Sequence, residues 1–193
     1  MTPSYCYQRL LAHYAEPQRH YHTLQHIMEC LREFDAARAL AQQPRLIEFA
    51  IWFHDVIYDP RAHDNEERSA QLAVDCLQAA GAQPGDLERV RGLVLATKQH
   101  LANTPDEALL IDIDLSILGQ GRERFDEYER QIRQEYSWVP ETVFVEKRAE
   151  VLRRFFDRPR IYSTDHFFTR YEQQARGNLE HSLASLQHGA KSQ

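Results

Sequence analysis

Histidine and aspartate side chains gather in three short stretches of the sequence. Residues 21–26 carry two histidines, residues 54–55 are a His-Asp doublet, and two aspartates stand in the apolar run at residues 109–115: His22, His26, His54, Asp55, Asp112 and Asp114. Imidazole and carboxylate together are a donor mixture that binds divalent transition metals. A charged aspartate in an apolar helix is costly unless it is paired or bound to a metal. The three stretches therefore predict a metal site.

The spacing limits how these side chains can reach one ion. His22 and His26 are four residues apart and share one face of a predicted helix. His54 and Asp55 are adjacent and cannot share a face in a regular helix, so both reach one ion only near a helix end. The polar segment 58–64 reads as a loop that supplies such an end. Asp112 and Asp114 are alternatives for the last position.

Prolines, glycines and capping residues divide the chain into about eight predicted helices. The first five cover residues 4–15, about 21–40, 44–57, 64 or 65 to 81, and 85 or 86 to about 100. Residues 108–118 form the next, a charged helix runs to about residue 136, and two more begin at Pro140 and Ser163. The helix from Pro44 has almost no polar face and should be central and buried. With no alternating strand pattern, the sequence predicts an all-α fold.

The composition is that of an ordinary folded domain. The chain has 193 residues, 42% of them hydrophobic and 27% charged, and this length favours one domain. A net charge of −6 gives no electrostatic footprint for a nucleic-acid polymer. No apolar run approaches the length of a membrane span, and the first residues do not resemble a signal peptide. We therefore expect neither a nucleic-acid nor a membrane partner.

Three cysteines, Cys6, Cys30 and Cys76, lie far apart and form no Cys-x-x-Cys pair. Each stands among helix-forming residues, where a reduced core thiol would fit. An odd number of reduced thiols is typical of a reducing compartment, so the sequence predicts a cytoplasmic protein.

The order of a histidine, a His-Asp doublet and a distant aspartate resembles the HD-domain superfamily of metal-dependent phosphohydrolases, which have a compact, all-helical fold. The segment Tyr-His-Thr-Leu-Gln-His at residues 21–26 is similar to the Tyr-His-Asn-x-x-His signature of cyclic-nucleotide phosphodiesterases, and Asp-Leu-Ser at residues 114–116 resembles their final motif. Thr23 in place of the asparagine, and the lack of His-Pro-Gly after the doublet, separate the chain from those enzymes. The fuller pattern, with Trp-Phe-His-Asp at residues 52–55, resembles a bacterial branch of predicted HD phosphohydrolases. The match covers about residues 21–119.

The resemblance implies roles for individual residues. The metal ligands would be His26, His54, Asp55 and Asp114, and His22 would donate a proton to the leaving group. Glu66 is a second candidate acid or water-orienting group. The metal is one of Mn, Fe, Co, Ni, Zn or Mg. A second ion near His100 is an alternative, although Asn65 stands where two-metal members carry a histidine, so we expect one ion.

The resemblance also implies one HD-type domain over residues 1–193, with a metal-site core at about 21–119 and C-terminal helices at about 120–187 packing on it. A phosphorylated substrate needs cationic donors, and the candidates are Lys98, Arg133, Arg160 and Arg176. The expected function is hydrolysis of a small-molecule phosphate ester, with a nucleotide as the first candidate. The alternatives are a di-iron oxygenase and a metal-binding regulatory module without turnover. The sequence does not indicate the oligomeric state.

Overall fold

Helices make up all the regular structure in the computed structural model, which describes the backbone of residues 3–189 and the side chains of residues 6–187. Over these residues the chain forms nine α-helices and two short 3-10 helices and has no strand. The predicted all-α fold of about eight helices is confirmed. No described helix is long and apolar enough to cross a membrane. The chain divides into two compact units, Met1–Asp114 and Leu115–Gln193, and the single-domain arrangement stays a prediction.

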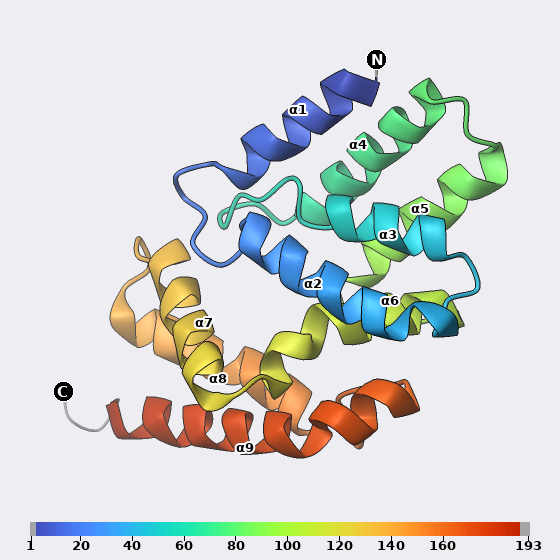
Figure 1. The fold of residues 1–193 in the computed structure, drawn as a ribbon. Helices are drawn as coiled ribbons and strands as arrows, with labels where there is room; N and C mark the ends of the chain where they lie inside the picture. Colours follow the sequence, from blue (N-terminus) through green and yellow to red (C-terminus); the bar gives the residue numbers. More distant parts are fainter. Residues whose placement is uncertain (1–2, 190–193) are drawn as a thin grey trace. The chain divides into compact units, whose positions relative to one another are not determined.

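The first unit is built around its third helix. Its elements are α1 (Pro3–Tyr14), α2 (Leu24–Ala37), η1 (Arg38–Leu40), α3 (Pro44–Phe53), α4 (Asn65–Ala79), α5 (Pro84–Ala96) and α6 (Pro105–Asp114). Helix α3 packs against α2, α4, α5 and α6 (Figure 1). Ile47, Ala50 and Ile51 on α3 are fully buried, and burying each isoleucine stabilises the fold by about 1.5–3 kcal/mol. The expectation that this helix is central and buried is confirmed.

Helix α2 begins three residues later than the sequence predicts. Thr23 has an extended backbone, and its hydroxyl accepts a hydrogen bond from the Gln25 amide at 3.3 Å, so it caps the helix. His22 therefore lies in the turn before α2. The prediction that His22 and His26 share one helical face is wrong.

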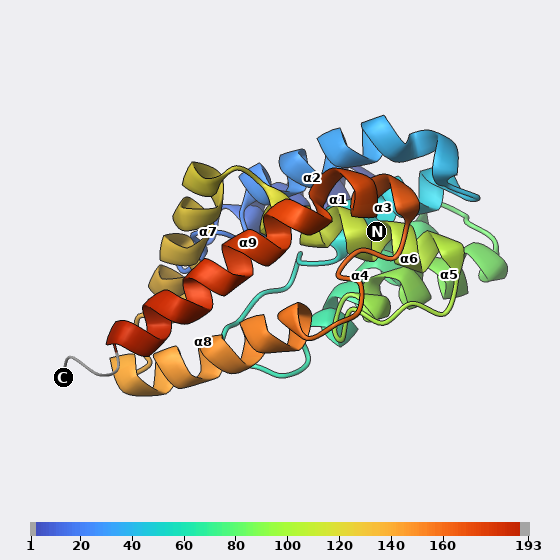
Figure 2. The same cartoon turned by 90° about the horizontal axis from the view of Figure 1, so that it is seen from below.

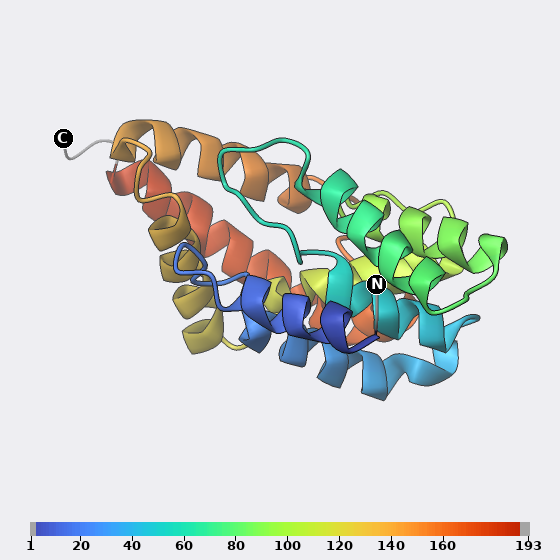
Figure 3. The same ribbon diagram turned by 90° about the horizontal axis from the view of Figure 1, so that it is seen from above.

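Helix α3 ends at Phe53, four residues before the predicted end. The His54 amide still donates to the Ala50 carbonyl, and the chain then leaves the helix. A partner from another element satisfies the next backbone groups, since the Ser69 hydroxyl on α4 accepts from the Ile57 amide at 3.0 Å. Figure 3 shows the connection from α3 to α4 as a long loop. His54 and Asp55 thus stand at a helix end, as a shared ion requires.

The second unit begins with η2 (Leu115–Gly119), followed by α7 (Arg122–Glu135), α8 (Glu141–Phe156) and α9 (Asp165–Gly189). Here the expected helix 108–118 is replaced by α6, which starts at Pro105, and by the tighter η2. Helix α9 packs against η2 and α8 (Figure 2). A Cβ atom on Gly119 would lie only 2.5 Å from Cβ of Tyr171. This approach between η2 and α9 is open only to glycine.

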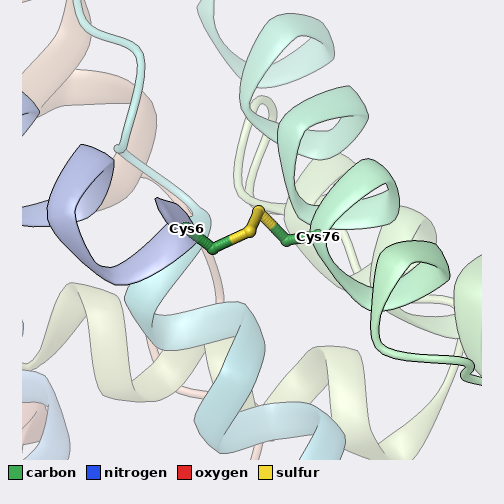
Figure 4. The surroundings of a disulfide bond; sticks show 2 residues. All are labelled: Cys6 and Cys76. Carbon is green, nitrogen blue, oxygen red and sulfur yellow. A yellow bond between two sulfur atoms is a disulfide. The ribbon is translucent and has the colours of Figure 1, made fainter. Parts of the chain in front are cut away.

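Cys6 and Cys76 form a disulfide that joins α1 to α4 (Figure 4). Their Cα atoms are 6.1 Å apart, within the usual range for a bridge. The prediction of three reduced thiols is therefore wrong for two of them, because a separation of 70 residues gives no sequence signal of contact in space. Cys30 is free and buried, as expected. With two of the three thiols in a disulfide, the cysteines do not indicate a cytoplasmic location.

Candidate metal centre

Four side chains from three segments of the first unit point their donor atoms at one another. His26 comes from α2, His54 and Asp55 from the turn after α3, and Asp114 from the last position of α6. One donor atom of each lies within 4.8 Å of the others, and this is the only such group of His, Cys, Asp and Glu side chains that the described residues contain. The structure thus brings together the four ligands that the sequence predicts.

The separations between these donor atoms fit a shared ion. Nε2 of His26 lies 3.2 Å from Nε2 of His54, 3.5 Å from Oδ2 of Asp55 and 3.2 Å from Oδ1 of Asp114. Nε2 of His54 lies 3.1 Å from the same Asp55 oxygen and 3.5 Å from the same Asp114 oxygen. Two donors at about 2.1 Å from one ion are about 3.0 Å apart at a right angle and about 3.4 Å apart at the tetrahedral angle. The donor set, two imidazole nitrogens and two carboxylate oxygens, suits a divalent transition metal.

The two histidines are buried and held from outside the cluster. Nδ1 of His54 donates to the Ile51 carbonyl at 2.9 Å, so that in the neutral ring the lone pair is on Nε2, which faces the cluster. The His26 ring contacts the Cys30 sulfur, 3.7 Å from both ring nitrogens, and lies 4.8 Å from the Tyr21 ring between centroids. Both imidazoles therefore have a fixed orientation.

The two imidazoles and the two carboxylates stabilise each other's charged forms. Burial opposes protonation of His54, but the charge of Asp55 and hydrogen bonds to Asp114 and Asp55 outweigh it and hold the pKa of His54 well above its ordinary value. Burial likewise opposes protonation of His26, but its interactions with Cys30, Tyr21 and the two carboxylates outweigh this effect. The pKa of His26 is therefore also held well above its ordinary value.

The carboxylates shift in the opposite direction. Burial alone would raise the pKa of Asp55, but the charge of His54 and hydrogen bonds from both histidines lower it well below the ordinary value. The pKa of Asp114 is lowered in the same way against its burial, by hydrogen bonds from His100, His26 and His54. A metal that binds here therefore competes with protons for the two imidazoles.

The choice between the two aspartates of α6 is decided by the helix. Asp114 faces the cluster, whereas Asp112 is fully buried and is not part of it. Residues two apart on a helix point to different sides, so only one of the two aspartates faces the histidines.

His22 lies beside the cluster without belonging to it. Its ring stacks on Tyr58 with 4.1 Å between centroids, and it is 6.1 Å from the His26 ring. Glu66, the other predicted acid, lies in the first turn of α4, where its carboxylate is 4.0 Å from the Lys98 ammonium. Of the two candidate acids, His22 is the one whose ring lies next to a residue of the cluster, His26.

His100 also approaches the cluster. Its Nε2 is 3.2 Å from Oδ2 of Asp114, and its φ of 52° is in the left-handed region, which non-glycine residues adopt rarely and often at functional sites. Asn65 has a local role, because its side chain bonds both the amide and the carbonyl of Asp59. The single ion stays a prediction, and a second ion near His100 stays the alternative.

The four predicted substrate-binding cations each have partners within their own unit. Lys98 is in the first unit and bonds Glu67 and the His63 carbonyl. The three arginines are in the second unit and have partners there. Arg133 bonds Glu141 and two backbone carbonyls, Arg160 bonds Asp165, and Arg176 bonds Glu172 and three carbonyls. These contacts hold loops and helices in place, and a role in substrate binding stays a prediction.

Sequence reasoning missed one buried residue close to the site. Arg19 is 5% exposed and contacts the backbone beside His22 and Asp55. Arginine is seldom buried, and nothing in the spacing of residues 16–22 distinguishes it from a surface side chain.

Comparison with known proteins gives no family assignment. No family model, no curated protein and no solved structure matches the chain.

Proposed function

We propose that the protein is a metal-dependent hydrolase of a small-molecule phosphate ester, with a nucleotide as the substrate class to test first. The observation that supports this is the cluster of two buried imidazoles and two half-buried carboxylates, drawn from three separate segments. Four ligands leave coordination positions for water and a phosphate oxygen on a six-coordinate ion. The resemblance to HD-domain phosphohydrolases, noted from the order of these residues, points to the same chemistry.

In this proposal one divalent ion is bound by the four side chains of the cluster, His26, His54, Asp55 and Asp114. A divalent ion at such a site lowers the pKa of a water molecule and polarises a phosphoryl group. The bond from His54 Nδ1 to the Ile51 carbonyl keeps Nε2 directed at the ion. A single ion is favoured because Asn65 bonds the Asp59 backbone, at the position where two-metal members of the superfamily carry a ligand.

His22 has the proton-transfer role. Its imidazole lies beside the ligand His26 but outside the ligand group, and the stacked Tyr58 ring fixes its plane. A histidine placed there can protonate the oxygen of the leaving group.

The test is a metal-reconstituted activity screen with matched variants. Wild-type protein loaded separately with Mn²⁺, Co²⁺, Ni²⁺, Zn²⁺ and Mg²⁺ is offered aryl phosphates, diesters and nucleotides. The proposal expects phosphate release that a chelator abolishes. His22→Ala should retain the metal and lose turnover by about 10²- to 10⁴-fold, whereas His20→Ala, an exposed neighbour, should behave as wild type. If His22→Ala also loses the metal, then His22 is a ligand and the assignment is wrong.

A further inference from the structure

The turn that carries His54 and Asp55 has backbone groups that α3 cannot satisfy. Because α3 ends at Phe53, the carbonyls of Asp55 and Val56 have no helical partners. Arg19 supplies them. Its Nη1 donates to the Asp55 carbonyl at 2.7 Å and its Nη2 donates to the Val56 carbonyl at 2.8 Å.

The same guanidinium also binds the other side of the site. Nη1 of Arg19 donates to the His22 carbonyl at 2.9 Å. One planar group therefore joins the turn before α2, which leads into His26, to the turn after α3, which carries two of the four ligands.

Arg19 is itself held on every side. Its Nε donates to Glu16 at 3.0 Å, its side chain is fully buried, and its guanidinium lies 5.2 Å and 5.4 Å from the ring centroids of Tyr14 and Tyr58. The Tyr58 ring in turn stacks on His22. Arg19 thus contacts His22 in two ways: it bonds the His22 carbonyl directly, and it lies against the Tyr58 ring that stacks on the His22 imidazole.

We infer that Arg19 is a positioning residue that fixes the His54–Asp55 turn against the His22 turn and thereby sets the affinity of the site for its metal. This rests on the proposed metal site. Arginine is required because its rigid fork reaches three carbonyls from one plane, whereas one lysine ammonium cannot take the place of two separated NH₂ groups. Its hydrogen bonds to the two turns go to backbone carbonyls, so it acts on the ligands through the backbone that carries them.

The test measures binding of Co²⁺ alone, by titration and by the visible spectrum of the bound ion. We expect Arg19→Gln to bind Co²⁺ about 10- to 100-fold more weakly, the usual effect of losing a group that orients ligands, with a shifted spectrum. Arg19→Lys, which retains the charge and the aliphatic stem, should also bind more weakly. If Arg19→Gln does not fold, the Co²⁺ affinity of Arg19→Lys tests the inference in its place.

Two controls separate positioning from general destabilisation. Ile47→Val truncates the buried core of α3 and should lower the melting temperature while leaving Co²⁺ affinity unchanged. Arg38→Gln removes an exposed arginine with two ion pairs and should change neither. Wild-type affinity and spectrum in Arg19→Gln, or in Arg19→Lys where the first is unfolded, would overturn the inference alone. No Co²⁺ binding by wild-type protein would overturn the proposed function, and the inference with it.

Discussion

Replacement of Asp55 by asparagine is expected to change the stability of the protein in two separable ways. The substitution keeps the size of the side chain and removes its charge. In the metal-free protein, Oδ2 of Asp55 lies 3.1 Å from Nε2 of His54 and 3.5 Å from Nε2 of His26. Coulomb's law gives about 5 kcal/mol for unit charges at 3.1 Å and an effective dielectric constant of about 20.

The net cost is smaller because burying the charges opposes this attraction. Removing one partner of a buried ion pair costs about 3–5 kcal/mol, and the lower end applies because the Asp55 side chain is 21% exposed. For a chain of this size about 3 kcal/mol corresponds to a fall of about 6–12 °C in melting temperature. Metal-free Asp55→Asn should melt lower than wild type by that amount.

The second effect appears when metal is added. A ligand at 100 times its Kd stabilises the folded state by about 2.7 kcal/mol, which raises the melting temperature by about 5–11 °C. Calorimetry with Mn²⁺ or with a chelator should show this rise in wild type and in the surface control Asp35→Asn, but not in Asp55→Asn. A full metal-dependent rise in Asp55→Asn would refute the assignment of Asp55 as a ligand.

Three further outcomes are expected. The raised pKa values of His26 and His54 stabilise the metal-free protein fully below about pH 6.5, the unfolded value, and this contribution is lost as pH rises through the folded values. Metal affinity should rise over the same pH range, because fewer protons have to be displaced from the histidines. Denaturation of the metal-free protein and Co²⁺ titrations, both from pH 5.5 to 9, measure the fall in stability and the rise in affinity. A Co²⁺ affinity that does not change with pH would contradict this prediction. Gly119→Ala should lower the free energy of unfolding, measured in urea, by about 1–3 kcal/mol because the added methyl group overpacks against Tyr171. Gly177→Ala is the control, since a Cβ atom there meets nothing within 4 Å and causes no clash. Equal losses in the two variants would refute the close approach at Gly119. Cys6→Ser should lower the free energy of unfolding by up to about 4 kcal/mol, the chain-entropy value for a loop of this length, and three free thiols in denatured wild-type protein would show that the bridge does not form.

A metal site could be anticipated from the types and spacing of these residues, and the resemblance to HD-domain proteins implied which four side chains would form it. A carboxylate in an apolar run needs a partner, and the adjacent pair His54 and Asp55 requires a helix end, which the structure places at Phe53. The helix containing His22 was predicted too long, since the cap at Thr23 is a weaker signal than the apolar periodicity that follows it.

The parts that were missed depend on contacts between distant residues. Cys6 and Cys76 meet because α1 and α4 pack together, which no spacing rule indicates. Arg19 is buried because α3 stops early and leaves carbonyls to be bonded. The choice of Asp114 over Asp112 depends on which side of α6 faces the histidines. Local pattern predicted a cluster of histidines and aspartates, and tertiary packing determined which residues form it.

The metal site itself is tested by the metal content per chain of tag-free protein, measured by elemental analysis beside an Asp114→Asn control. We expect about one divalent ion per wild-type chain after reconstitution and none in the control, because Oδ1 of Asp114 contacts both His26 and His54. Two irons per chain would favour the di-iron alternative. No metal in wild-type protein after reconstitution would contradict the account.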